Sequence, residues 1–133
     1  MMPARKFFRQ TSGSSAVEFA LTAPLFMGLV WVTIEAGMAL WTQFGLENAV
    51  EAAARCASVY YASTCNSATA IKSYAANNTL GVTIPVSSFT YIKGVCGNQV
   101  TASYSQAYFT NVFHVPSVTL SAKACFPDIN AGG

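Results

Sequence analysis

The chain has 133 residues, which suits one small domain or a membrane anchor with a modest domain attached. Charged residues make up 9% of the total and hydrophobic residues 53%, whereas soluble domains carry about 25% charged residues, so an ordinary cytosolic protein is not expected. The formal net charge is +2, and three of the seven basic residues lie in the first nine positions. The remainder has no basic patch that would favour nucleic acid.

A basic leader is followed by an apolar segment that is long enough to span a membrane. No charged residue occurs from Phe19 to Ile34, and this run lies between Glu18 and Glu35. The two acids are 17 positions apart, about 25 Å along a helix, which is close to the hydrocarbon thickness of about 30 Å. We therefore expect a membrane helix with one acid near each interface. The positive-inside rule predicts a cytosolic N-terminus from the basic residues of the leader, Arg5, Lys6 and Arg9.

Two common kinds of apolar segment fit this pattern less well. A cleaved secretory signal has a short apolar core and a small-x-small site, whereas here the apolar run continues into a helical pattern. A plain signal anchor has no need of Glu18, because a charge costs about 2.5–3.5 kcal/mol at the centre of a membrane helix and less near its end. An uncleaved, membrane-anchored binding or adhesin module remains the alternative that uses such an anchor.

The segment that begins at Gly13 reads Gly13-Ser14-Ser15-Ala16-Val17-Glu18-Phe19. It resembles the prepilin peptidase site of the type IV filament superfamily, in which cleavage follows the glycine and an acid is the fifth residue of the mature chain. The resemblance implies cleavage between Gly13 and Ser14, which makes Glu18 the fifth mature residue. An aromatic residue directly after the acid, here Phe19, is similar to the tight-adherence (Flp) branch.

Further segments are similar to the TadE-like proteins of that branch, namely residues 16–24, 34–37 and 47–55. Ser14 stands where type IVa pilins usually have phenylalanine, which argues against that branch. The resemblance, over roughly residues 13–58, implies a structural minor pilin (pseudopilin) of a tight-adherence pilus. A type II secretion pseudopilin is the alternative within the same class.

The resemblance also implies partners and a location. Cleavage gives Ser14 a free α-amine. In the family the acid is held to pair with the amine of a neighbouring subunit. In a dry filament core such a pair is strongly favoured over an unpaired acid. The expected partners are other pilin and pseudopilin subunits, the prepilin peptidase, pilus assembly platform proteins and the cytoplasmic membrane. The expected location is the inner membrane in a single pass, and then the periplasm or an extracellular pilus.

Two other residues of the apolar helix are expected to act in filament assembly together with Glu18 and Phe19. Pro24 lacks an N–H, so the Ala20 carbonyl loses its helical partner and a kink or loosened turn is predicted; simple tolerance of proline in membrane helices explains it equally well. Glu35 is expected either to contact a partner subunit or to lie among lipid headgroups.

Beyond the apolar segment the pattern predicts a helical stem with an i,i+4 ion pair between Glu51 and Arg55. A short second helix is expected at Ala68–Ala76, because Asn77-Asn78 then stops it. Strands are predicted at three segments, of which the first two are joined by a Gly97-Asn98 turn: Ser88–Val95, Gln99–Phe109 and Val118–Ala124.

The predicted fold is α+β and pilin-like, with a long N-terminal membrane-spanning and stem helix, a short second helix and a three-stranded antiparallel sheet packed on the stem. The expected divisions are a leader (1–13), a transmembrane and filament-core helix (14–42), an amphipathic stem (43–62) and a small disulfide-stapled ectodomain (63–133).

All four cysteines follow the apolar segment, which indicates two disulfides on the exported side: Cys56, Cys65, Cys96 and Cys125. Proximity along the chain favours Cys56–Cys65 and Cys96–Cys125 among the three possible pairings. Neither spacing resembles the close ligand pairs of a structural zinc site, so no metal is expected.

Chemistry-bearing motifs are missing from the sequence. His114 is the only histidine, and the chain contains no nucleophile elbow, phosphate loop or credible pair of catalytic carboxylates. We therefore expect neither an enzyme nor a cofactor.

Overall fold

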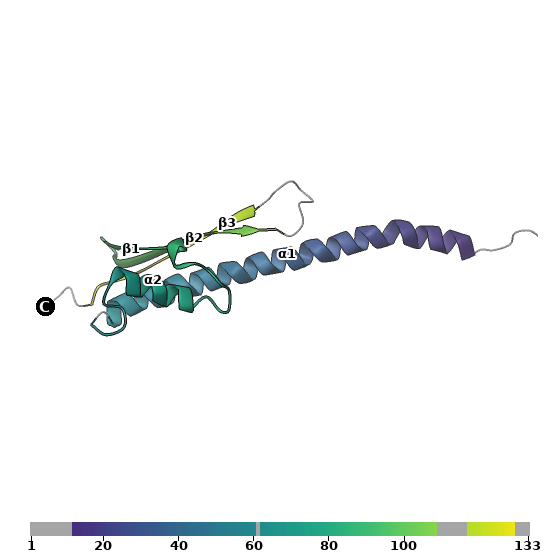
Figure 1. Cartoon of the computed structure of the whole chain (residues 1–133). Helices are drawn as coiled ribbons and strands as arrows, with labels where there is room; N and C mark the ends of the chain where they lie inside the picture. The colour runs from purple at the N-terminus through teal and green to yellow at the C-terminus, as the bar shows by residue number, and fades with distance from the viewer. Residues whose placement is uncertain (1–11, 61, 109–116, 130–133) are drawn as a thin grey trace, which may run out of the picture. The chain divides into compact units, whose positions relative to one another are not determined.

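The computed structural model describes residues 12–60, 62–108 and 117–129. The chain divides into two units, Met1–Ile34 and Glu35–Gly133. The elements, labelled in Figure 1, are the helices α1 (Ser12–Val59) and α2 (Ala68–Asn77), the 3₁₀ turn η1 (Val86–Ser88), and the strands β1 (Phe89–Gly94), β2 (Gly97–Ala107) and β3 (Ser117–Phe126).

The described part of the first unit is the N-terminal portion of α1. Its sequence combines leucine and alanine, which are strong helix formers, with valine, isoleucine and aromatic residues, whose helix propensity is only slightly lower. The helix continues through Pro24 without interruption. Thr22 and Thr33 satisfy their hydroxyls within the helix, donating to the carbonyl oxygens of Glu18 at 3.0 Å and Leu29 at 2.9 Å.

The second unit contains the remainder of α1, the second helix and the sheet. Helix α2 begins after Ser67, whose hydroxyl accepts a hydrogen bond from the Ala70 N–H at 3.2 Å, and it ends at Asn77. The Asn78 amide then donates to the carbonyl oxygen of Tyr74 at 2.8 Å, which explains why the predicted stop lies where the two asparagines occur.

The three strands form one antiparallel sheet in the order β1-β2-β3. The register aligns Phe89 with Ala102 and Ala102 with Ala122, and these side chains are buried on the same face. The opposite face is exposed or half-buried and bears serine and threonine at several positions, together with Ile92, Gln99 and Lys123. The predicted α+β fold, with a long helix, a short helix and a three-stranded antiparallel sheet, is therefore confirmed.

The predicted position of the hairpin turn is wrong by two residues. The turn consists of Val95 and Cys96, and Gly94 pairs with Gly97 to close it. Gly97 has a φ of 109°, and a Cβ there would collide with the carbonyl oxygen of Phe126 and with the Pro127 Cα at 2.7 Å. Glycine is thus required both by the positive φ at the end of the turn and by the close approach of β3.

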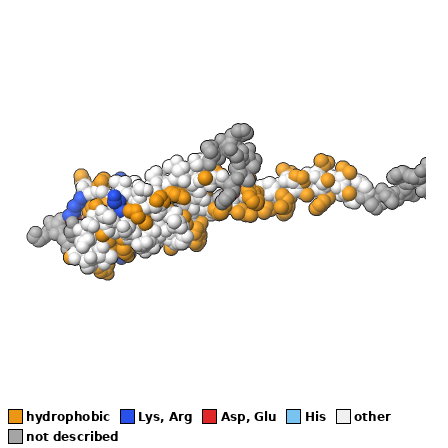
Figure 2. Space-filling view, viewed as in Figure 1, with side chains coloured by type: hydrophobic (Ala, Val, Ile, Leu, Met, Phe, Trp, Pro, Cys, Tyr) orange, Lys and Arg blue, Asp and Glu red, His pale blue; other side chains and the backbone are white. Residues whose placement is uncertain are grey.

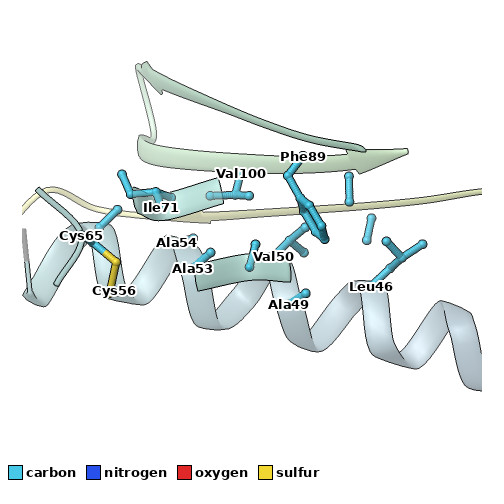
Figure 3. Close-up of a cluster of buried hydrophobic side chains, with 14 of the residues drawn as sticks. Leu46, Ala49, Val50, Ala53, Ala54, Cys56, Cys65, Ile71, Phe89 and Val100 are labelled. Carbon is cyan, nitrogen blue, oxygen red and sulfur yellow. A yellow bond between two sulfur atoms is a disulfide. The ribbon is translucent and has the colours of Figure 1, made fainter. Parts of the chain in front are cut away.

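The core of the second unit lies between α1 and the buried face of the sheet (Figure 3). The helix contributes mostly small side chains, which are almost fully buried: Ala49, Ala53, Ala54 and Ala57. Larger side chains fill the remaining space from both sides, and the largest are Phe89, Leu46, Ile71, Val50 and Val100. Because alanines leave little volume on the helix, the sheet can approach it closely.

Two disulfides brace this unit. Cys56 of α1 is bonded to Cys65, nine positions later, and Cys96 of the hairpin turn is bonded to Cys125 of β3, 29 positions later. These are the pairings that proximity along the chain favours. In the chain-entropy account, closing loops of these lengths stabilises the fold by about 2.5 and 3.5 kcal/mol.

Candidate functional site

The N-terminal portion of α1 exposes its apolar side chains all round. Side chains such as Phe19, Leu25 and Leu29 are 66–78% exposed, and hydrophobic side chains gather along this helix in Figure 2. By length and composition α1 can cross a membrane, and none of its most apolar stretch is buried within the chain. A helix that is apolar on every side requires an apolar environment, either lipid or other helices.

The beginning of this helix contains the predicted cleavage site. Gly13 and Ser14 lie in the first turn of α1 and are exposed. Glycine and serine are weak helix formers, so this turn costs little to unwind for a peptidase. Glu18 is exposed one turn further on, and its carboxylate makes no ion pair with any residue that the structure describes.

Pro24 lies about three turns beyond the start of the exposed helix. It cannot donate to the carbonyl oxygen of Ala20, which therefore has no i+4 donor. The Thr22 hydroxyl lies 3.0 Å from the carbonyl oxygen of Glu18 and 3.3 Å from that of Phe19, so the neighbouring carbonyls gain a side-chain donor. A loosened turn at Pro24 stays a prediction.

Glu35 is the first residue of the second unit, and it is only 9% exposed. It is also engaged in an interaction rather than isolated. The sequence suggested a partner subunit or lipid headgroups as its environment, and burial within its own chain was missed. The same side of α1 is covered further on, since Thr42 is 4% and Leu46 0% exposed. Lipid therefore cannot surround the helix completely beyond Ile34.

A buried polar network joins the stem to the sheet, and the sequence did not suggest it. Asn98 is 1% exposed, and its amide donates to the Ser58 hydroxyl at 3.1 Å while its oxygen accepts from the Tyr91 hydroxyl at 2.6 Å. The Ser58 hydroxyl in turn lies 3.1 Å from the Ala54 carbonyl oxygen. Because each polar group has a partner, the network ties two strands to α1 at one register.

The outer edge of β3 faces α1 across a groove of about 520 Å³, which is lined by Glu47, Val50, Glu51 and residues 121–126. The predicted ion pair between Glu51 and Arg55 is absent. The Arg55 guanidinium lies instead over the Phe126 ring, 5.9 Å from its centroid. Within the described residues, the Lys93 ammonium forms an ion pair with the Asp128 carboxylate, at 2.6 Å between Nζ and Oδ2.

Some predicted features lie outside the described residues, namely His114 and the leader with Arg5, Lys6 and Arg9. Within residues 12–60, 62–108 and 117–129, no group of histidine, cysteine or carboxylate side chains is placed to hold a metal ion.

A protein-family model described as "TadE-like protein" matches residues 13–55. No curated protein and no solved structure matches the chain. The matched segment begins at the predicted cleavage site, contains the exposed apolar helix and Glu35, and ends one residue before Cys56. The resemblance to the TadE-like family is thereby confirmed over residues 13–55, and it indicates a protein associated with the tight-adherence pilus.

Proposed function

We propose that this protein is a minor pilin, or pseudopilin, of a tight-adherence pilus system, which a prepilin peptidase cleaves after Gly13. One observation carries the proposal: an apolar helix that is exposed on every side begins at the cleavage site and has a single acid, Glu18, in its first turns. A purely soluble domain would not leave such a helix uncovered, and a simple anchor would not need the acid.

The length of the exposed helix fits a membrane stage before assembly. Residues 13–34 span about 33 Å at 1.5 Å per residue, which matches a hydrocarbon core of about 30 Å. The next residue, Glu35, belongs to the second unit and is buried there. We propose that the anchor ends where the second unit begins. The basic residues of the leader favour a cytosolic N-terminus, which puts the second unit outside the cytoplasmic membrane.

Glu18 supplies the chemistry that moves the subunit from lipid to filament. Its carboxylate has no ion-pair partner in the described residues, and cleavage creates a positive α-amine at Ser14. A neighbouring subunit can bring its own amine to this carboxylate, so that both charges are neutralised within an apolar bundle. The pair offsets the cost of about 2.5–3.5 kcal/mol that an unpaired charge pays inside the membrane.

The intact mass of the protein from its native membrane tests the proposal. A species that begins at Ser14 and lacks four hydrogens, for two disulfides, is expected. The matched variant Gly13→Ala should remain full length and stay in the membrane. A full-length wild-type species in cells with an active prepilin peptidase would instead support the anchored binding module. Recovery of the processed subunit in Flp-type filaments separates this role from that of a type II secretion pseudopilin.

A further inference from the structure

Strand β3 is an edge strand whose outer peptide groups can be assigned. Peptide groups of successive residues in an antiparallel strand point alternately toward and away from the neighbour. The Phe126 carbonyl oxygen lies against Gly97 of β2, so it points inward. The Ser121 carbonyl oxygen accepts a hydrogen bond from the Gln43 amide of α1 at 3.1 Å, so it points outward. The same alternation gives outward peptide groups to Thr119, Lys123 and Cys125.

The groove beside this edge is elongated. Gln43 lies at Ser121, and the Ser58 hydroxyl lies 3.4 Å from the Phe126 carbonyl oxygen, so α1 and β3 run alongside in the same direction. The helix residues that line the groove, Glu47 to Glu51, span about 6 Å, and the strand residues 121–126 advance about 17 Å. A groove of about 520 Å³ with one wall of strand edge has the form that an extended peptide segment fills.

The other wall of the groove is acidic. Glu47 and Glu51 are both exposed and lie one helical turn apart, which makes them a mildly repulsive pair. Glu47 accepts a hydrogen bond from the neutral Gln43 amide at 2.8 Å, and Arg55 is held over Phe126. No cation of the described residues forms an ion pair with either carboxylate. Lys123 also lines the groove, from the strand, and it forms no ion pair with either acid. Positive side chains placed beside Glu47 and Glu51 would therefore relieve the repulsion between the two acids.

We propose that the groove binds an extended segment of another polypeptide, which adds a fourth strand to β3 and places Lys or Arg at positions i and i+2 against Glu47 and Glu51. The spacing supports the pattern, because four residues of helix rise about 6 Å and two residues of strand advance about 6.7 Å. The proposal concerns the chemistry of the groove and does not depend on the pilin assignment.

Two peptides of identical composition test this pattern on the full chain in neutral detergent. One is Thr-Val-Lys-Thr-Lys-Val-Thr, with both lysines on one face of a strand. The other is Thr-Lys-Val-Thr-Lys-Val-Thr, with the lysines on opposite faces. Fluorescence anisotropy should show at least about fivefold tighter binding of the first peptide, a ratio that reflects the second charge pair. Equal affinities would overturn the proposal.

Amide hydrogen exchange locates the bound peptide. Binding of the first peptide should slow exchange at Lys123 and Cys125, whose N–H groups point outward, and should leave Ala122 and Ala124 unchanged, because their N–H groups already face β2. A peptide that is N-methylated on the amides facing β3 should lose its affinity while the protein stays unaltered. Undiminished binding of the methylated peptide would exclude strand addition.

Charge variants test the acidic wall. The double variant Glu47→Gln and Glu51→Gln should bind the two peptides equally. Lys72→Gln, on α2 and away from the groove, makes the chain more acidic, so a non-specific attraction would become stronger there, whereas the proposal predicts no change. Full preference for the first peptide in the double variant would remove the carboxylates from the site.

Discussion

Gly45 of α1 lies directly against the backbone of Thr79, such that a Cβ on the glycine would stand 2.6 Å from the Thr79 carbonyl oxygen. The segment after α2 is held here by two further contacts, since the Asn48 amide donates to the Asn78 carbonyl oxygen at 2.8 Å and the Thr79 hydroxyl donates to backbone carbonyls. The stem and this segment therefore meet through their backbones, and the smallest side chain is required between them.

Gly45→Ala should destabilise the second unit, because either the stem or the Thr79 segment must move. We expect a loss of about 1–3 kcal/mol in the free energy of unfolding, measured by chemical denaturation in detergent. Gly37→Ala is the matched control, since a Cβ at Gly37 meets nothing within 4 Å and alanine favours the helix. Equal stability of the two variants would contradict the close approach.

Asn98→Ala should remove one hydrogen bond from the Ser58 hydroxyl and one from the Tyr91 hydroxyl. We expect a loss of about 2–3 kcal/mol in the free energy of unfolding, because two hydrogen bonds disappear and polar groups stay buried. Ser103→Ala, on the exposed face of the same strand, should cost less than about 0.5 kcal/mol. Thermal unfolding followed by circular dichroism compares the two.

Glu35→Gln should affect the fold before it affects assembly, because Glu35 is buried within the second unit. We expect a loss of about 1–3 kcal/mol in the free energy of unfolding of the isolated subunit in detergent. An unchanged unfolding midpoint together with poor filament incorporation would instead assign Glu35 to a contact between subunits.

Glu18→Ala should be processed normally but assemble poorly, since the variant lacks the carboxylate that we propose to pair with the amine of a neighbouring subunit. We expect at least about a tenfold decrease in the subunit recovered with filaments, which corresponds to about 1.4 kcal/mol. Thr22→Ala serves as the control, because Thr22 bonds only to the helix backbone one turn away. Unaltered recovery of the Glu18 variant would exclude the acid from assembly.

Removing each disulfide should destabilise the second unit by a different amount. Replacing Cys96 and Cys125 by alanine should cost about 3.5 kcal/mol, and replacing Cys56 and Cys65 about 2.5 kcal/mol, because the first pair closes the longer loop. Denaturation of the two double variants beside the parent measures both losses. A larger loss for the shorter loop would contradict the loop-length argument.

Local signals predicted the elements well and their contacts poorly. Helix α2 was recognisable because Asn77-Asn78 supplies a strong local stop, and the strands were recognisable from their alternation. The Gly97-Asn98 pair misled, because both residues satisfy tertiary demands: the glycine admits the carbonyl of Phe126, and the asparagine joins the buried network. The neighbouring residues in the sequence do not distinguish an asparagine in a turn from an asparagine buried in the core.

In the candidate site, too, the features within one continuous segment were predictable and the contacts between distant segments were not. Glu18 and the exposed helix follow from charge and apolar pattern along a continuous segment, which is information that a sequence displays directly. The burial of Glu35 and the groove beside β3 arise from segments far apart in the chain. The helical spacing of Glu51 and Arg55 suggested a local pair, but the ring of Phe126, 71 positions beyond Arg55, attracted the guanidinium instead.

Under the proposed function, the two disulfides also set the order of events during export. Thiols stay reduced in the cytosol, so a chain that has not yet crossed the membrane lacks about 6 kcal/mol of stabilisation. Small domains have only about 5–15 kcal/mol in total, so under the proposed function we expect the reduced second unit to be much less stable before export than after it. In the proposed topology, oxidation of Cys56 with Cys65 and of Cys96 with Cys125 on the far side completes the fold and makes the crossing one-way.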